Sequence, residues 1–555
     1  MNFASAVYGA MAVGLTVWLG ARLFGSVFAG LGAGLFLAFS YTFWSQAVTA
    51  EVYTLHLLIF SAATIALTSW ADRPSAGKLA LFYGIYAIGF GNHLSMVLLL
   101  PAFALFLLLN RRATQHGDPL WPGSIAVALG MALLGALQYA WNFRGLWTSL
   151  EPPSSLAEGL GKFWFDVTKA DWRETLVMNV SETGLQTRPA MYWFDLRQQV
   201  GLTGVLLATI GFAYVMARWP RRGLLLALLF AANVGFAWTY NVGDAYIFFL
   251  PSHYVIALCA GAGIAAAAWA LSKIAPPILA NSAASLLLLY PAWRGYDTFP
   301  AVDRSWDTRA ESLLSEFTSR EDAAYGVDTN WQIQNAFEYF MKRNRPFVPW
   351  FATEELPWIG TGELKRLVDD NHAIGRTVIV TPQTYRKLHA RVDASATVKR
   401  TELMTRVKAL PPGTAYVFGM LRPDREYPID DNELGDVWTS LTGGSMQFPA
   451  PHNFVVVAGH IGQTPVVLHS ADEPYRLRAH LASFDVDIRT TSWLPTDTIR
   501  RAGFGHIIVN RKHALTLERG LSFVALGPGG FTAYGSSLFA PIPKLLLGLD
   551  PRQQP

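Results

Sequence analysis

The chain is poor in cysteine and in charge. Cys259 is the only cysteine among 555 residues and lies within an apolar run, which excludes an internal disulfide. Charged residues make up 15% of the chain and hydrophobic residues 52%, too apolar a balance for a single soluble protein. The net charge of +4 is small, and the lysines and arginines cluster between apolar runs. Nucleic acid is therefore not expected as a partner, whereas a lipid bilayer is.

The second half of the chain also lacks the motifs of many soluble enzymes. From Arg294 onward it contains no zinc-ligand spacing, phosphate-binding loop, GxSxG nucleophile elbow or internal repeat. Its GPGG stretch, Gly527–Gly530, is expected to form a turn. Functional residues therefore have to be sought in the apolar first half.

Apolar stretches long enough to cross a membrane as helices fill that first half. They cover residues 4–24, 25–44, 52–70, 79–92, 94–110, 123–142, 199–217, 223–240, 246–271 and 275–292. The sequence thus predicts a polytopic α-helical membrane domain with about ten transmembrane helices over residues 1–293. A long loop at 142–198 interrupts it.

Basic residues fall in alternate connections between these stretches. They are Arg22, Arg73, Lys78, Arg111, Arg112, Arg218, Arg221, Arg222 and Lys273. Because basic loops stay in the cytoplasm, we predict a multi-pass protein of the inner (cytoplasmic) membrane. The other turns, the loop 142–198 and the C-terminal part then lie on the external, periplasmic side. Met1 is external too, and we expect a further helix upstream of it.

Short strand-like runs separated by polar or helical stretches begin after Arg294. The expected strands are 324–327, 377–380, 415–419, 454–458 and 506–509. Pro411, Pro412 and Gly413 mark an internal boundary. We predict a soluble α/β domain at 294–412 and a β-rich α+β domain at 413–555, both external.

Polar turns interrupt the apolar sequence at three places on the external side. WSQAVTAEVYTLH (Trp44–His56) holds Glu51, GFGNHLSM (Gly89–Met96) holds Asn92 and His93, and YNVGDAYIFFLPSH (Tyr240–His253) holds Asp244, Tyr246 and His253. An ionisable residue in such a place is a functional-site hypothesis by default. Their convergence on one face strengthens that reading, because unrelated structural residues need not share a side.

Each of these side chains also has an ordinary structural interpretation. Glu51 can stabilise the dipole of the helix that follows it, and Asp244 can cap one. The imidazole of His93 can satisfy a structural hydrogen bond, or it can bind a phosphate, a metal or a proton. Asp244 near His253 also suits a sugar hydroxyl or a divalent cation, the one cofactor considered. The loop 142–198, with Arg144 among tryptophans, is either a substrate wall or an interfacial aromatic belt.

Taken together, WSQAVTAEVYTLH, GFGNHLSMVLLLP and YNVGDAYIFFLP resemble a bacterial multispanning family of unknown function. That family is related to transmembrane protein O-mannosyltransferases of the C-type glycosyltransferase (GT-C) superfamily. The resemblance covers roughly Met1–Tyr290. It implies a GT-C-like membrane fold and a hexosyltransferase that moves a sugar such as mannose from a polyprenyl-phosphate donor to a hydroxyl of a protein or glycan acceptor, externally.

On this hypothesis Glu51 and Asp244 are the catalytic candidates, Asp244 with Tyr246 contacting the sugar or acceptor. His93 and Arg144 are candidates for the donor phosphate, with Asn92 and His253 as further substrate-binding residues. In the superfamily the catalytic base usually lies in the first external loop, after the first helix. This sequence matches from the second helix onward, so we expect the first helix and loop upstream.

Two other functions are compatible with the sequence. A transporter or flippase of lipid-linked intermediates also needs polar residues inside a helical bundle, but such proteins more often carry acids at mid-membrane and inverted repeats. Neither feature is apparent here. A catalytically inactive envelope scaffold would use its external domain to bind a partner.

Overall fold

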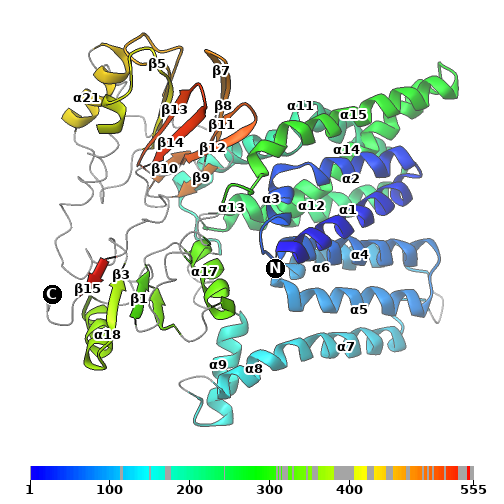
Figure 1. Cartoon of the computed structure of the whole chain (residues 1–555). Helices are drawn as coiled ribbons and strands as arrows, with labels where there is room; N and C mark the ends of the chain where they lie inside the picture. Colours follow the sequence, from blue (N-terminus) through cyan, green and yellow to red (C-terminus); the bar gives the residue numbers. More distant parts are fainter. Residues whose placement is uncertain are drawn as a thin grey trace. The chain divides into compact units, whose positions relative to one another are not determined.

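The computed structural model divides into two compact units (Figure 1). One comprises Met1–Val302 and Ser492–Arg500, and the other comprises Asp303–Thr491 and Arg501–Pro555. The residues described are 2–112, 117–148, 152–168, 177–242, 244–307, 311, 314, 323–327, 331–344, 348–352, 361–380, 405–421, 431–444, 454–470, 475–490, 493–496, 499–502, 505–517, 520–535 and 547–549.

The first unit is helical. Its helices are α1 (Asn2–Phe24), α2 (Val27–Ala38), α3 (Tyr41–Ala47), α4 (Tyr53–Asp72), α5 (Ala76–Asn92), η1 (Leu94–Leu99), α6 (Leu100–Leu109), α7 (Pro122–Ala136), η2 (Leu137–Tyr139), α8 (Ala140–Trp147), α9 (Leu156–Thr168), α11 (Glu182–Arg218), α12 (Pro220–Thr239), α13 (Ala245–Phe248), α14 (Leu250–Leu271) and α15 (Pro277–Val302). Each apolar stretch predicted to span falls on one or more of these helices. The loop at 142–198 is itself largely helical among its described residues.

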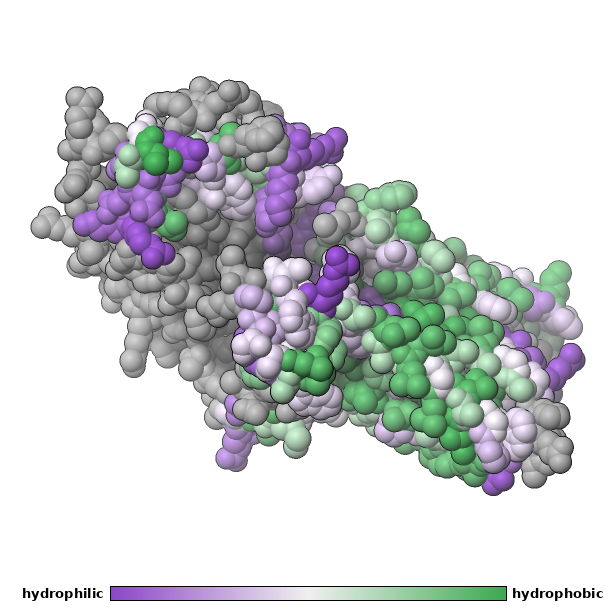
Figure 2. Space-filling view, turned by 90° about the horizontal axis from the view of Figure 1, so that it is seen from below, coloured by the Kyte–Doolittle hydropathy of each residue, from purple (hydrophilic) through white to green (hydrophobic). Residues whose placement is uncertain are grey.

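Fewer helices qualify as spans than the sequence predicts. Among the described residues six helices are long and apolar enough to cross a membrane, or seven if α2 and α3, bent by 68° at their break, form one span. The prediction of about ten was too high, since α5 has 17 residues and η1–α6 is also short. The stretch predicted at 275–292 falls on α15, which has 26 residues but is not among the qualifying helices. Hydrophobic side chains gather on the visible face of the helical unit (Figure 2). The chain is a polytopic α-helical membrane protein with a C-terminal β-rich soluble part.

The two ends of the helical unit differ in charge. Arg22 at the end of α1 and Arg222 at the start of α12 both pair with Asp72, at 2.7 and 3.0 Å. At the other end of α1, the Ser5 hydroxyl donates to the Glu51 carbonyl and accepts from the Glu51 N–H. Basic connections thus meet at one end, as their alternation predicts, and the turn with Glu51 lies at the opposite end.

A kink divides α11. Gly201 has φ 69° and ψ 171°, a backbone conformation that is essentially confined to glycine. Helical hydrogen bonding is interrupted there, and α15 satisfies the freed carbonyls: the Tyr290 hydroxyl donates to Val200 O at 3.2 Å, and Arg294 donates to Gln198 O.

Among its described residues, the second unit contains three separate sheets. Its strands are β1 (Ala323–Val327), β2 (Trp350–Ala352), β3 (Thr377–Val380), β4 (Ala415–Leu421), β5 (Phe454–His460), β6 (Val467–Ser470), β7 (Arg476–Leu481), β8 (Phe484–Thr490), β11 (Gly505–Val509), β12 (Lys512–Leu517), β13 (Gly520–Gly527), β14 (Gly530–Gly535) and β15 (Leu547–Leu549). A further pair, β9 (Trp493–Thr496) and β10 (Ile499–Ala502), belongs to the first unit except for the last two residues of β10. All five predicted strands are present. The GPGG stretch connects β13 and β14, as predicted.

Two of these sheets form an antiparallel sandwich. The sheet β14-β13-β4-β5-β6 packs Val417, Val456 and Val524 against Ile488 and Ile507 of the sheet β12-β11-β8-β7. Alternate residues of β4 point the other way and pack against α21 (Asp431–Thr442). This alternation explains why the strands are hydrophobic on both faces.

The third sheet, β15-β3-β1-β2, is mostly parallel. Its helices are α17 (Trp331–Asn344) and α18 (Thr361–Ala373), which follow β1 and β2 along the chain. The C-terminal strand β15 pairs antiparallel with β3. The boundary predicted between 412 and 413 therefore does not separate the sheets, because the end of the chain returns to the α/β part.

Replacing Gly201 by alanine should destabilise the helical unit. The new methyl group would require the disfavoured backbone conformation and would meet the Tyr290 hydroxyl. A residue forced into such a region costs about 1–3 kcal/mol. Unfolding by SDS titration measures the loss. Gly14→Ala is the matched control, since a methyl group there meets no atom within 4 Å. Equal stability of the two variants would contradict the role given to the kink.

Candidate functional site

All three predicted polar turns meet at Tyr53, in the first turn of α4. The Tyr53 ring lies 5.7 Å from the ring of His93 and 6.0 Å from that of Phe248, centroid to centroid. Next to it, Asn92 Nδ2 donates to the Val52 carbonyl at 3.3 Å. Sequence segments more than a hundred residues apart thus converge on one side chain.

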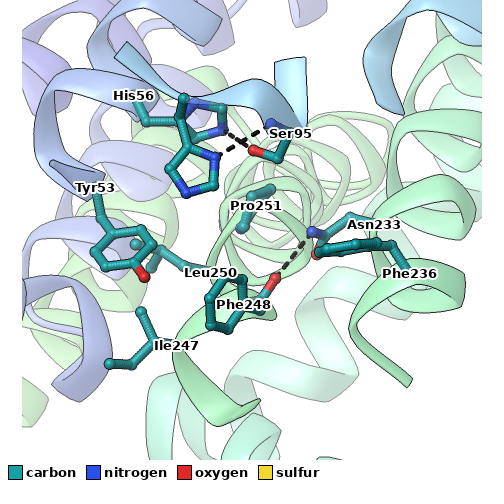
Figure 3. Close-up of a pocket in the computed structure, with 10 residues that line it drawn as sticks. Tyr53, His56, Ser95, Asn233, Phe236, Ile247, Phe248, Leu250 and Pro251 are labelled. Atoms are coloured by element: carbon teal, nitrogen blue, oxygen red, sulfur yellow. Dashed lines mark hydrogen bonds between the residues drawn. The ribbon is translucent and has the colours of Figure 1, made fainter. Parts of the chain in front are cut away.

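A small pocket opens beside Tyr53 (Figure 3). Two imidazoles form one side of it, with the His56 and His93 rings 5.3 Å apart. Hydrophobic side chains of α13 and α14 face them across the pocket. The lining residues are Tyr53, His56, His93, Ser95, Asn233, Phe236, Ile247, Phe248, Leu250 and Pro251.

Ser95 fixes the orientation of both imidazoles. Its backbone N–H donates to His93 Nδ1 at 3.2 Å, and its hydroxyl lies 3.5 Å from His56 Nε2. Burial lowers the pKa of His93, so the ring is neutral near pH 7. Because Nδ1 is the acceptor, Nε2 carries the proton. His93 therefore offers an N–H donor to a group bound in the pocket.

Asn233 holds the opposite wall in place. Its Nδ2 donates to the Phe248 carbonyl at 2.9 Å, and its Oδ1 accepts from the Ser252 N–H at 2.9 Å. Both carboxamide ends are thus used where α13 gives way to α14. Asn233 shapes the pocket through the backbone of the aromatic segment.

Glu51 and Asp244 interact electrostatically, so their turns lie close together. Burial, and then the like charge of Asp244, raise the pKa of Glu51 above its ordinary value of 4.5. Asp244 lies at the N-cap of α13 and is exposed, but surrounding protein partly desolvates it and raises its pKa above 3.8. Like-charged carboxyls held together favour retention of a proton, which is a property of acid–base sites.

Of the predicted site residues, His93 alone is among the residues that line this pocket. Glu51, Asn92 and Asp244 lie on the turns that meet at Tyr53 but are not part of the lining. His253 is buried in α14 and stacks on Tyr192, with centroids 5.8 Å apart, outside the pocket lining. Arg144 is exposed on α8, and no described hydrogen bond or ion pair joins it to Glu51 or His93. Tyr246 is half-buried on α13 and does not line the pocket.

Sequence reasoning missed four polar lining residues, Tyr53, His56, Ser95 and Asn233, as well as the five apolar ones. A signal existed for two of them. Tyr53 and His56 are three residues apart at the start of an apolar helix, so they share a face, and a histidine within such a helix is unusual. Asn233 lies inside an apolar span and becomes visible only through the α13–α14 backbone that it contacts.

Metal binding gains no support from the geometry. Within the described ranges no group of three or more His, Cys, Asp or Glu side chains is arranged to hold an ion. The divalent cation considered for Asp244 remains a prediction.

The raised pKa values make stability depend on pH. A raised carboxyl pKa means that the folded state holds the proton more tightly than the unfolded chain, so ionisation costs stability as pH rises past the ordinary values of 3.8 and 4.5. The Tm of the wild type should therefore fall relative to that of Glu51→Gln/Asp244→Asn as pH increases from about 4. Scanning fluorimetry in detergent measures the difference, and a Tm difference independent of pH would contradict the raised pKa values of the two carboxyls.

Residues 1–117 match the family model described as the Protein O-mannosyl-transferase TMEM260 N-terminal domain. The match includes Glu51, Tyr53, His56, Asn92 and His93. Asp244 lies beyond it. No curated protein has a matching sequence.

Solved structures similar to this chain include ArnT from Cupriavidus metallidurans. The apo structure gives a TM-score of 0.44 at 14% identity, covering 71% of this chain and 80% of that one. The structure bound to undecaprenyl phosphate gives a TM-score of 0.44 at 13% identity, covering 70% and 80%. The relation to O-mannosyltransferases predicted from the three motifs is confirmed by the family match, which covers the first two of them.

Proposed function

We propose that the chain is a membrane glycosyltransferase that moves a hexose, with mannose as the first candidate, from a polyprenyl-phosphate donor to a hydroxyl of a protein or glycan. The observation that carries this proposal is that the turns with Glu51 and Asp244 meet at Tyr53, beside a pocket lined by two imidazoles and an apolar wall. The match of residues 1–117 to an O-mannosyl-transferase domain supports the reaction class.

The lipid chain and the phosphate of the donor would bind on opposite sides of the pocket. Ile247, Phe248 and Leu250 offer apolar contacts to the first isoprene units, and His93 offers an Nε2–H donor to the phosphate. Hydrogen bonds aimed at a phosphate stabilise the negative charge that develops as it leaves. His56 and Ser95 lie next to His93 and extend this donor set.

The carboxylates supply the base. The acceptor oxygen attacks the anomeric carbon, the bond from that carbon to the phosphate oxygen breaks, and polyprenyl phosphate departs with the electron pair. The acceptor proton passes to Glu51 or Asp244. A carboxyl whose pKa is raised toward neutrality is a better base than an ordinary one, and both of these are raised.

The proposal includes the external side of the inner membrane as the place of transfer. The polar turns lie at the end of the bundle opposite Arg22, Asp72 and Arg222. Basic connections mark the cytoplasmic side, so the pocket and the soluble unit are assigned to the periplasm.

Removing either acid should abolish transfer while the protein still folds. Radiolabelled polyprenyl-phosphate mannose is supplied in proteoliposomes with a periplasmic extract, and release of label from the lipid fraction is measured. Glu51→Ala and Asp244→Ala should each lower the rate by about 10²–10⁴-fold, since a general base contributes that much.

Glu338→Gln is the matched control, because this carboxylate lies on the surface of α17 and pairs with Lys342. It should transfer at the wild-type rate. Full transfer by both alanine variants would refute the assignment of the acids, and no transfer by the wild type with any hexosyl donor would refute the proposed function.

A further inference from the structure

The connection between α11 and α12 consists of one tryptophan with two cations over its ring. α11 ends at Arg218 and α12 begins at Pro220, so Trp219 alone joins them. The Cζ atoms of Arg218 and Arg222 lie 5.6 and 5.8 Å from the centroid of its ring. A guanidinium over a tryptophan is attracted by the negative face of the ring. This turn belongs to the end of the bundle where Arg222 pairs with Asp72, called here the basic end.

The end of α14 holds a cation in the same way. Trp269 and Lys273 are four residues apart, and Lys273 Nζ lies 5.3 Å from the centroid of the Trp269 ring. Trp269 is 45% exposed, so its ring faces the surroundings of the helical unit. Tryptophan and basic residues at the ends of spans are typical of the boundary between lipid and water.

Tyr214 of α11 joins these two cation–ring pairs. Its ring centroid lies 5.7 Å from that of Trp219 and 5.7 Å from that of Trp269. Within the described residues the two tryptophan rings make no contact with each other, so Tyr214 lies between them. Trp219, Tyr214 and Trp269 therefore form an aromatic row, with Arg218 beside one end and Lys273 beside the other.

Many other cations at the basic end are bound to protein groups. The pairs are Arg22 and Arg222 with Asp72, Arg111 with Asp118, Arg221 with Asn110, and Lys78 with the carbonyls of Ser69 and Arg73. By contrast, Arg218 and Lys273 make no hydrogen bond or ion pair in the part of the chain that the structure describes. The rings hold these two charges in place while their N–H groups stay available to an anion.

Apolar surface continues from the aromatic row along α11. Ile210 and Leu206 precede Tyr214 at intervals of four residues, so they lie on the same side of the helix. They are 44% and 60% exposed. This surface suits an acyl chain, and the cations at the row suit the phosphates of a lipid headgroup.

We propose that the aromatic row with Arg218 and Lys273 binds an anionic phospholipid whose headgroup carries two phosphates joined by glycerol, as in cardiolipin. Because the cations lie beside opposite ends of the row, one phosphate meets one of them and two linked phosphates meet both. Each phosphate accepts charge-assisted hydrogen bonds from its cation. The inference does not rest on the proposed function, since the row lies at the other end of the bundle from Tyr53.

Native mass spectrometry of the full chain in detergent, titrated with tetraoleoyl cardiolipin, measures the binding. One cardiolipin should bind per chain, about five-fold or more tightly than phosphatidylglycerol, which has one phosphate. A basic residue at a lipid surface contributes roughly that factor. Arg218→Gln/Lys273→Gln should therefore weaken cardiolipin binding by about 25-fold. Polyprenyl phosphate also has one phosphate and should displace cardiolipin no better than phosphatidylglycerol does.

Arg73→Gln/Arg112→Gln is the matched control. It removes the same charge from exposed sites at the basic end, and neither arginine lies over a tryptophan ring within the described residues. It should bind cardiolipin as the wild type does. Arg218→Lys/Lys273→Arg keeps both charges and should bind within about two-fold of the wild type. If Arg218→Gln/Lys273→Gln fails to fold, Lys273→Gln alone, beyond the end of α14, should still show a loss of about five-fold.

Three results would overturn the inference. Equal weakening by the two double glutamine variants would mean that the basic end attracts anionic lipid through its total charge. Equal affinity for cardiolipin and phosphatidylglycerol would refute the two-phosphate headgroup. Displacement of cardiolipin by an equal concentration of inorganic phosphate would refute a lipid as the ligand.

Discussion

The high cost of leaving polar groups unsatisfied in an apolar bundle governs the helical unit. Several polar side chains that enter the bundle bind one another or a backbone group. At one end of the bundle these contacts meet at Tyr53. Its ring contacts His93 and Phe248. The residue before it, Val52, accepts a hydrogen bond from Asn92. The same constraint explains why Gln199 and Arg188 of α11 are bound to Thr42 and Tyr240.

This arrangement places three kinds of side chain in separate parts of the candidate site. The acidic turns carry Glu51 and Asp244, the imidazoles of His56 and His93 lie deeper, and the aromatic segment of α13 closes the far wall. A lipid-linked sugar needs these three environments in this order: water and a base at the sugar, donors at the phosphate and apolar contacts at the chain. The kink at Gly201 and the hydrogen bond from Tyr290 of α15 fix the position of α11, whose side chains bind Thr42 and Tyr240 beside the two acidic turns.

Much of the fold could be predicted from hydropathy, because spans and strands are local patterns. The ten apolar stretches are helical and the five expected strands exist, but α5 and η1–α6 were counted as full spans although they are short. The return of β15 to β3 could not be foreseen, since pairing at that separation leaves no local pattern. For the site, the turns with Glu51, His93 and Asp244 could be found because polar residues there interrupt apolar sequence. His253 also interrupts apolar sequence, yet its ring stacks on Tyr192 and not in the pocket. Asn233 contributes by binding the backbone of Phe248, a contact that depends on the fold and cannot be predicted from the sequence.

The most direct test of the account is to map where a photoreactive polyprenyl-phosphate analogue attaches in the membrane-embedded protein. Mass spectrometry of the crosslinked peptides gives the contact residues. The account predicts label on the peptides that contain Tyr53–His56 and Ile247–Leu250, with competition by unlabelled polyprenyl phosphate. Specific label at the opposite end of the bundle, around Arg22, Asp72 and Arg222, would contradict it.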